Sequence, residues 1–249
     1  MELAYIYDES FDGLLTALFE ARGSEPMPDK ICGIDEFESD LFCDKKIIKT
    51  DKQSALKAIN LISNEISIDA MHNIFYAFLA SSGSHGKIIY DYFRLGLEKK
   101  RRIDRFLQDE RVIALHRLRD KLHIERHRLL GLIRFQKVEN GFYYAKIEPD
   151  NNVVGLIAPH FSKRLANERW MIHDVSRNIA AINEPVGKWS VVEASLNREP
   201  ELDCDEPLYQ NLWRTFFKSV AIENRTNPKL QKRFIPVRYW KNLVEMQKN

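Results

Sequence analysis

The hydrophobic pattern of this chain changes its period at Gly131, and no other sequence feature constrains the fold as strongly. Over residues 52–130 the apolar side chains recur every three to four positions, which is the period of an amphipathic helix. The runs 132–138 and 142–147 resemble strands, and Glu139-Asn140-Gly141 separates them. Because Asn-Gly readily adopts the positive φ angles of a tight turn, this segment predicts a β-hairpin. Helices are therefore expected in the first half and a sheet in the second.

Local signals extend this pattern to both ends of the chain. Residues 3–7 predict a strand, and capping-type residues at 8–10 lead into a helix over residues 11–21. We also expect strands at 31–34 and 46–49, a long helix at 109–130, a helix at 153–165 interrupted or kinked near Pro159, strands at 170–175, 178–182 and 189–193, and helices at 208–222 and 237–247. The expected class is α+β, with a helix-rich first half, an antiparallel, hairpin-rich sheet in the second half and C-terminal helices.

The domain organisation follows from length and from one break in the pattern. A chain of 249 residues can form one large domain or two small ones. The Ser- and Gly-rich segment 81–86 suggests a boundary near residue 85, between an acidic N-terminal part and a basic part. A single domain over residues 1–249 fits the sequence equally well.

The net charge of +2 hides a strong segregation of charge along the chain. Lys and Arg number 7 against 15 Asp and Glu in residues 1–86, 16 against 8 in 87–146, 6 against 11 in 147–210, and 9 against 2 in 211–249. The two basic blocks could join into one phosphate-binding face, or the blocks of opposite sign could cancel within the fold.

Composition excludes several classes of protein. No apolar run approaches the ~20 residues of a membrane-spanning helix, and the first residues lack the features of a signal peptide. The three cysteines, Cys32, Cys43 and Cys204, form no CxxC pair. We therefore expect a cytoplasmic protein with no membrane partner, no structural zinc and no iron–sulfur cluster. Phosphate-binding Gly-rich loops and the GxSxG motif are also absent from the sequence.

Two histidines on the long predicted helix, His123 and His127, stand four residues apart, a spacing that lets two imidazoles share a metal ion. In the metalloprotease motif a glutamate directly follows the first histidine, which is not the case here. Arg126 and Arg128 would also repel a cation. We therefore expect no metal site and no cofactor.

The segment 160–177 holds the candidates for catalysis. His160 and His173 can move protons near neutral pH, and Asp174 can orient an imidazole. On a strand, neighbouring side chains point to opposite faces, so His173 and Asp174 cannot pair directly. The alternative is structural: the histidine and aspartate bond to loops, and the nearby arginines face solvent.

The C-terminal stretch 225–241 interleaves cations with aromatic residues, which is typical of nucleic-acid surfaces because cations meet phosphates and rings stack on bases. The alternative is that Tyr239 and Trp240 are core residues that dock the last helix. The candidate nucleic-acid contacts over the whole chain are Arg94, Arg128, Arg134, Arg164, Arg177, Arg225, Lys229, Arg233, Arg238 and Trp240.

Motifs distributed over nearly the whole chain resemble a bacterial family of DNA metabolism proteins that is defined by a domain of unknown function. The matching pieces are Tyr5-Ile6-Tyr7-Asp8, residues 10–15, Phe93-Arg94-Leu95-Gly96, Glu125-Arg126-His127-Arg128, Gly131, Arg134-Phe135, residues 160–177, the stretch from Leu212-Trp213 through Arg225, residues 227–231, Pro236 and Arg238-Tyr239-Trp240. The resemblance implies a partner, a radical SAM protein of DNA repair or modification. It also implies a relation to chains in which this domain is fused to uracil-DNA-glycosylase-type domains.

The same resemblance limits what this chain is expected to do. The sequence ends at Asn249 without a glycosylase part and contains no CxxxCxxC triad, so we expect neither activity of the chain itself. Where the resemblance leads us to expect an aromatic residue near 181–183, the chain has Asn183, which puts a base-stacking role there in doubt.

Three functions are consistent with these features. The leading hypothesis is a DNA-binding accessory protein in DNA repair or modification that acts with the radical SAM partner. The second is an enzyme on a damaged or modified base, in which His160 or His173 is the acid or base and an extruded base stacks on Trp170 or Tyr239. The third is a protein-interaction scaffold whose basic helix docks an acidic partner.

Overall fold

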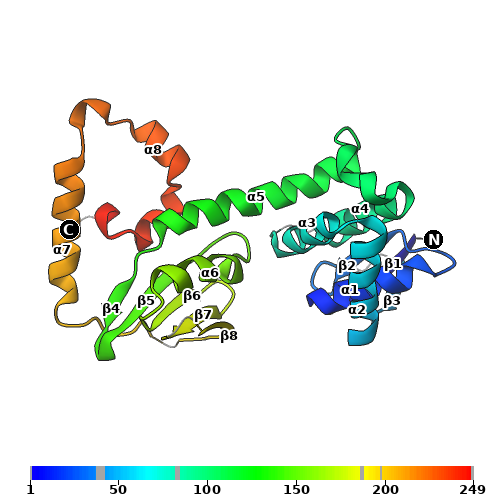
Figure 1. Ribbon diagram of the computed structural model, residues 1–249, viewed down its shortest axis with the longest axis horizontal. Helices are drawn as coiled ribbons and strands as arrows, with labels where there is room; N and C mark the ends of the chain where they lie inside the picture. Colours follow the sequence, from blue (N-terminus) through cyan, green and yellow to red (C-terminus); the bar gives the residue numbers. More distant parts are fainter. Residues whose placement is uncertain (1, 38–42, 82–84, 186–187, 197, 248–249) are drawn as a thin grey trace. The chain divides into compact units, whose positions relative to one another are not determined.

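The computed structural model describes residues 2–37, 43–81, 85–185, 188–196 and 198–247. The chain divides into two compact units, Met1–His123 and Ile124–Asn249, and each has its own buried core. The boundary lies inside the long helix α5 (Glu110–Leu132), which is therefore part of both units (Figure 1).

The first unit is built on a small parallel sheet. Its strands β1 (Glu2–Tyr7), β2 (Lys30–Gly33) and β3 (Cys43–Ile47) lie in the order β2-β1-β3, and both neighbours run parallel to β1. Its helices are α1 (Phe11–Arg22), α2 (Lys52–Leu61), α3 (Ile68–Leu79), α4 (His85–Lys99) and the first part of α5, with a π-helical turn at Ile62–Ile66 and a 3-10 helix at Lys100–Arg105. Apolar side chains of the helices and of β1 and β2 share one core.

Helix α1 begins where the sequence predicts it. The Ser10 hydroxyl oxygen accepts the amide of Gly13 at 2.9 Å, which caps the first turn. Asp8 accepts hydrogen bonds from Ser10 at 2.6 Å and from Thr50 at 2.8 Å. A Cβ at Gly13 would lie 2.1 Å from an Asp8 carboxylate oxygen, so a larger residue here would displace Asp8 from these hydrogen bonds.

Helix α4 is tied to the sheet of the first unit by a chain of hydrogen bonds. Nε2 of His85, the first residue of α4, lies 2.9 Å from the hydroxyl of Tyr7 at the end of β1. Its Nδ1 lies 2.9 Å from a carboxylate oxygen of Glu36. The buried Tyr7 hydroxyl and the Glu36 carboxylate therefore fix where α4 starts.

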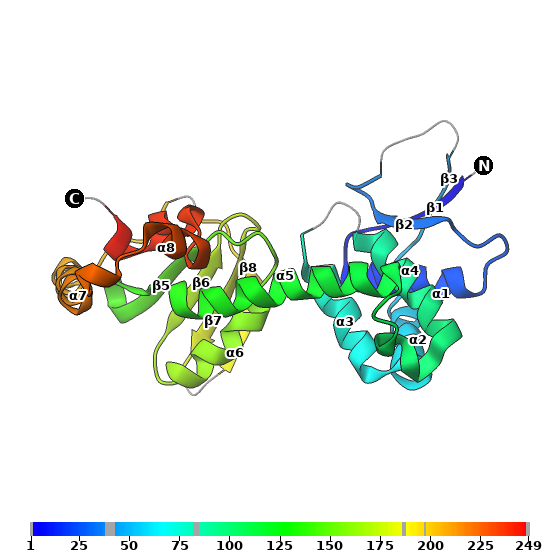
Figure 2. The same ribbon diagram turned by 90° about the horizontal axis from the view of Figure 1, so that it is seen from above.

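The second unit contains a five-stranded sheet. Strands β4 (Gln136–Val138), β5 (Phe142–Ile147), β6 (Trp170–Asp174), β7 (Ile179–Glu184) and β8 (Lys188–Glu193) lie in that order. Its helices are the end of α5, α6 (Val154–Arg164), α7 (Glu206–Val220) and α8 (Pro228–Phe234), with 3-10 helices at Glu139–Gly141, Glu223–Arg225, Val237–Asn242 and Val244–Met246. Helix α6 covers one side of this sheet, and the C-terminal segment that includes α8 lies on the other (Figure 2).

Glu125 fastens the C-terminal segment of this unit to α5. Its buried carboxylate accepts hydrogen bonds from the amides of Asp150 and Asn151, both at 2.8 Å, and from the Asn151 side chain at 2.6 Å. It also accepts from the Tyr239 hydroxyl and from Arg238, the latter at 3.4 Å. One side chain on α5 thus holds both the loop that follows β5 and the 3-10 helix Val237–Asn242.

The α+β class is confirmed, with helices dominating the first half, a sheet in the second and helices at the C-terminus. The expectation of an antiparallel sheet is wrong at one place, because β5 and β6 pair in parallel. The connection between them contains α6, and such a helical crossover returns the chain to the same end of the sheet. The other three strand pairs are antiparallel.

Several predicted boundaries are corrected. Residues 132–135 are not part of a strand, because α5 continues to Leu132 and β4 starts at Gln136, and a 3-10 turn joins β4 to β5. The strand predicted at 46–49 lies at Cys43–Ile47, and part of the acidic connection before it, 38–42, is outside the described residues. The predicted last helix, 237–247, is instead two 3-10 helices, which are separated by Leu243 in an extended backbone conformation. None of the described helices combines the length and apolar character that a membrane span requires.

Candidate nucleic-acid interface

His173, a predicted catalytic residue, is buried on β6 with both ring nitrogens hydrogen-bonded. His173 is 3% exposed. Its Nδ1 lies 2.9 Å from the Tyr144 hydroxyl, and its Nε2 lies 3.0 Å from the carbonyl oxygen of Ala194. A carbonyl oxygen can only accept, so Nε2 donates to Ala194, and burial raises the pKa of Tyr144 to about 12. The imidazole therefore links β5 and β6 to the segment after β8, and its catalytic role stays a prediction.

Asp174 and Arg177 stabilise the turn after β6. The fully buried Asp174 carboxylate accepts the amides of Ser176 at 3.0 Å and Arg177 at 3.3 Å, and the Arg177 guanidinium at 3.0 Å. The same guanidinium donates to the carbonyl oxygens of Pro149, at 3.0 Å, and Asp150. Most of the donors of Arg177 are thus engaged within the protein.

The predicted segment 160–177 does not form one site. Arg164 lines a pocket with Tyr143 and Glu168, close to the first residue of β6, whereas Arg177 lies beyond its last residue. The five residues of β6 lie between Arg164 and Arg177, and each residue of a strand adds about 3.3 Å to the distance between its ends. His160 is exposed on α6, with its ring edge on the neighbouring Phe161.

The aromatic residues expected to stack on an extruded base are in the core. Trp170 is completely buried, with ring contacts to Phe135 and Phe161, and Tyr239 is buried as well. The stacking expectation for Trp170 and Tyr239 is therefore wrong, and the alternative of Tyr239 as a docking residue of the core is confirmed. Asn183 is also fully buried, opposite Trp170 in the sheet.

Two other predicted phosphate ligands are engaged in ion pairs of the second unit. Arg134 pairs with Glu245 through two contacts, at 2.7 and 3.3 Å, and the Glu245 side chain is 3% exposed. Arg238 lies 2.6 Å from Asp150 and 3.4 Å from Glu125. Acidic residues of the second unit itself therefore neutralise these cations.

Of the remaining predicted cations of this unit, Arg128, Arg225, Lys229 and Arg233 lie on α8 or next to it, whereas Arg164 does not. Arg128, on the last part of α5, donates to the carbonyl oxygen of Arg233 on α8 at 3.4 Å. Trp240 donates its indole N–H to the carbonyl oxygen of Ile235, directly after α8. The α8 surface, as we call it, carries Arg128, Arg225, Lys229, Lys232 and Arg233, none of which forms an ion pair within the described part of the chain. The two basic blocks of the sequence thus meet here.

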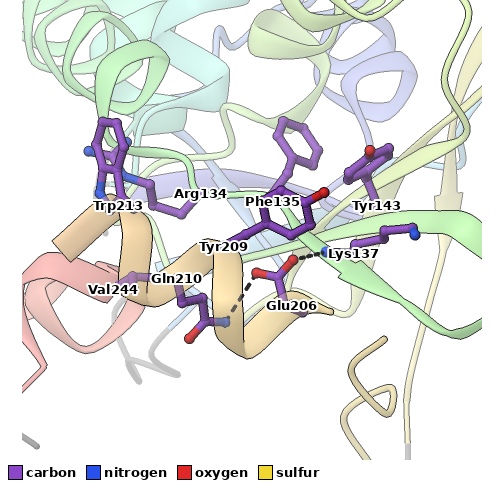
Figure 3. A pocket seen from close by; sticks show the side chains of 9 residues that line it. All are labelled: Arg134, Phe135, Lys137, Tyr143, Glu206, Tyr209, Gln210, Trp213 and Val244. Atoms are coloured by element: carbon purple, nitrogen blue, oxygen red, sulfur yellow. Dashed lines mark hydrogen bonds between the residues drawn. The ribbon is translucent and has the colours of Figure 1, made fainter. Parts of the chain in front are cut away.

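A pocket of about 450 Å³ opens between the start of the sheet and α7 (Figure 3). Its lining consists of Arg134, Phe135, Lys137 and Tyr143 on the sheet side, Glu206, Tyr209, Gln210 and Trp213 of α7, and Val244. We call it the aromatic pocket. Tyr209 and Trp213 are four residues apart on α7, so both rings face the same side of the helix. Phe135 and Tyr143 supply rings from the facing side (Figure 3).

On one wall of the aromatic pocket, Glu245 holds the side chains of Arg134 and Trp213 in place. The Arg134 guanidinium lies 5.4 Å from the centre of the Trp213 ring. Burial opposes ionisation of Glu245, but hydrogen bonds from Arg134 and from the Trp213 indole, at 3.0 Å, outweigh it and hold its pKa below the usual carboxyl value. Arg134 and Trp213 are therefore positioned by one buried carboxylate.

At the other end of the aromatic pocket a second carboxylate is fixed. The buried Glu206 accepts the amide of Lys137 at 2.9 Å and the side-chain amide of Gln210 at 3.1 Å (dashed lines in Figure 3). The hydrogen bond from the Lys137 ammonium to Asp203 raises the pKa of this lysine, so it stays charged.

The aromatic pocket adjoins two other features of the second unit. A second pocket of about 500 Å³ shares Arg134, Phe135 and Tyr143 with it and is also lined by Arg164. On the other side, Val244 of the aromatic pocket belongs to the 3-10 helix whose last residue contacts Gln231 of α8 at 3.9 Å. The 3-10 helix Val244–Met246 therefore links the wall of the aromatic pocket to α8.

Helix α7 also carries a row of exposed apolar side chains beside the pocket. Leu208, Leu212, Phe216 and Val220 follow at intervals of four residues and are 55–59% exposed. We call them the α7 stripe. Since folding normally buries such a helical face, the stripe is available for an interaction.

Other candidate residues lie in the first unit or in turns. Arg94 is exposed on α4 over the ring of Tyr90. Asp203, Cys204 and Asp205 bring three donor atoms within 4.8 Å of one another, but the Asp203 carboxylate already accepts the Asp205 amide, and these residues form the turn before α7.

A polar pocket of about 570 Å³ lies between α3 and α5 of the first unit. In its lining, one oxygen of Asp104 accepts hydrogen bonds from Tyr92 at 2.8 Å and Asn73 at 3.2 Å, and lies 3.1 Å from Nε2 of His116. His123 also lines it and packs against the ring of Tyr76, whereas His127 is exposed on α5.

Residues 84–245, well over half of the chain, match the model of DUF4130, a domain of unknown function, and the protein belongs to this family. A search among curated proteins found no match. The match begins at the start of α4 and ends in the last 3-10 helix, so it includes α5, the five-stranded sheet and the aromatic pocket.

The rings of the aromatic pocket were missed as functional residues by the sequence interpretation. Tyr209 and Trp213 stand four apart on an amphipathic helix, a signal that equally describes a buried face. Phe135 and Tyr143 look like ordinary strand residues. Only the exposure of α7 distinguishes this face from a core.

Proposed function

We propose that this protein binds DNA through its second unit and serves as an accessory protein in DNA repair or modification. The observation that carries the proposal is the contact between Arg128 and Arg233, which joins the two basic blocks of the sequence at α8. Five cations without acidic partners among the described residues then share one surface, whereas Arg134, Arg177 and Arg238 are neutralised internally. The family resemblance supports the DNA context.

Electrostatic binding of this kind has a measurable signature. Each cation that neutralises a phosphate releases counterions, so affinity falls steeply with salt. Fluorescence anisotropy with short single-stranded and duplex oligonucleotides at several salt concentrations tests it. Changing Lys229 and Lys232 to Ala should lower the affinity and reduce the slope of log K against log salt by about 1 for each phosphate that is no longer neutralised.

A matched control removes two lysines elsewhere in the same unit. Lys163 on α6 and Lys188 on β8, the strand at the opposite edge of the sheet from β4, are both exposed. Their change to Ala should leave the slope unchanged. Equal losses of affinity in the two double variants would show that net charge alone matters, and salt-independent or absent binding to every oligonucleotide would refute the proposal.

A second function is favoured by the α7 stripe. We propose that α7 docks a protein partner whose own surface is apolar and edged with acidic groups. Charge complementarity is the argument, since residues 211–249 carry 9 Lys and Arg against 2 Asp and Glu. The radical SAM protein that the resemblance implies is the candidate partner.

A further inference from the structure

The rings that line the aromatic pocket are unusual in remaining exposed after folding. Tyr209 is 59% exposed and Trp213 39% exposed, although both lie on an ordered helix. Aromatic side chains normally contribute to stability by burial, and these two contribute little in that way. Their position four residues apart turns both rings toward the facing side, where Phe135 and Tyr143 stand (Figure 3).

The space between the two walls suits a flat, ring-shaped ligand. A volume of about 450 Å³ lies within the range of small-molecule sites. Ring faces on both sides can stack on a heteroaromatic ring, and the fixed carboxylate of Glu206 with the tyrosine hydroxyls offers hydrogen-bond partners at the edges. The Arg134 guanidinium, held against Trp213, adds a planar cation to this wall.

The residues around the pocket indicate which kind of molecule would bring a heteroaromatic ring into it. Val244, which lines the pocket, and Met246, which contacts Gln231 of α8, belong to the same short 3-10 helix. A strand whose phosphates lie on the α8 surface would therefore bring its bases to the mouth of the pocket.

We infer that the aromatic pocket takes a single unstacked nucleobase from a strand whose phosphates lie on the α8 surface. The inference rests on the proposed function and adds the ligand to it. A base in a duplex is already stacked on its neighbours, so the pocket favours single-stranded or locally unpaired nucleic acid.

Tyr209 offers the sharpest test, because its exposed ring can be removed without opening the core. Tyr209→Ala should weaken binding of a single-stranded oligonucleotide on the order of 10-fold, as loss of a base-stacking ring does in other proteins. Tyr209→Phe keeps the ring and should restore the affinity. Leu208→Ala is the matched control, since Leu208 is the preceding residue, is also 59% exposed and does not line the pocket.

A second arm identifies the base as the ligand. A 2-aminopurine in the oligonucleotide should lose fluorescence on binding to the unchanged protein and to Tyr209→Phe, but less on binding to Tyr209→Ala. An abasic site at the same position should remove the difference in affinity between the unchanged protein and Tyr209→Ala. None of these changes should alter the salt dependence, because they remove no charge.

The outcomes separate the inference from the proposed function. Salt-dependent binding that is the same for Tyr209→Ala and Leu208→Ala would overturn the nucleobase inference alone. The nucleobase inference also fails if Tyr209→Phe binds as weakly as Tyr209→Ala. Base-dependent binding without salt dependence would refute the phosphate surface and keep the pocket, and no binding to any oligonucleotide would refute both.

Discussion

At the scale of single residues, buried carboxylates decide which cations are available. Glu245 holds Arg134 and the Trp213 indole, and Glu125 holds Arg238 together with the Tyr239 hydroxyl. A guanidinium in such a pair has few donors left for a phosphate. Removing one partner of a buried pair leaves the other charge uncompensated, so these pairs should matter for stability.

We expect Glu245→Gln to lower the free energy of unfolding by about 1.5–3 kcal/mol, the range for hydrogen bonds to charged groups. The pKa of Glu245 is lowered in the folded protein, so its contribution is present above the unfolded carboxyl pKa of about 4.3 and is lost as the pH falls through the folded value. Urea unfolding at neutral pH and in acid measures both effects. The difference in free energy of unfolding between the unchanged protein and Glu245→Gln should vanish in acid. A difference that persists in acid would contradict the ion-pair explanation. Glu139→Gln, at an exposed position, is the control.

At the scale of elements, α7 differs from the other long helices. Helices α1 to α4 bury their apolar faces in the core of the first unit, whereas the α7 stripe stays exposed. Its anchor to the rest of the second unit is made largely by polar groups, such as Glu206 at its start and Arg214, which donates to the carbonyl oxygen of Val244. The helix is thus held in place while one apolar face remains open.

Two substitutions on the stripe test this description. Leu212→Gln with Phe216→Gln should leave the unfolding temperature nearly unchanged, because neither side chain is buried in the chain itself. If the radical SAM protein proposed as the partner docks on the stripe, the same variant should no longer capture it in a pull-down without nucleic acid. As a comparison, Leu115→Ala in the core of the first unit should cost about 2–5 kcal/mol. A comparable loss of stability in the α7 variant would mean that the stripe is covered in the folded protein.

At the scale of the whole molecule, each of the two compact units has its own core. The core of the first unit joins α1 to α4 with the parallel sheet, and that of the second lies between the five-stranded sheet and the segments around it. Cooperative opening often follows such structural units.

Hydrogen exchange measured by mass spectrometry tests this division. Glu125→Ala removes the acceptor of the Asp150 and Asn151 amides, so peptides of the second unit should exchange faster, above all residues 148–151 and 237–246. Peptides of α1 and β1 should keep their protection. Leu14→Ala, in the first core, is the reciprocal variant and should accelerate exchange in α1 and β1 instead. Faster exchange of both units in either variant would show that they open together.

The prediction from sequence succeeded where neighbours along the chain set the structure. Ser10 caps α1 through an amide three residues away, and the change of period at Gly131 separates α5 from the sheet. Such signals act within one or two turns, so composition and spacing reveal them. The sequence also located the basic blocks and the amphipathic character of α7.

Contacts between distant segments decided the rest. The parallel pairing of β5 with β6 depends on α6 crossing back over the sheet, and the ion pairing of Arg134 depends on Glu245, more than a hundred residues away. Local periodicity carries no information on such distant partners, because any acidic residue of the chain could have formed the ion pair with Arg134. By itself the sequence determined the elements, their faces and where charge is concentrated. Only the tertiary structure decided which cations stay free and which aromatic rings are left exposed, because both depend on what packs against them in space.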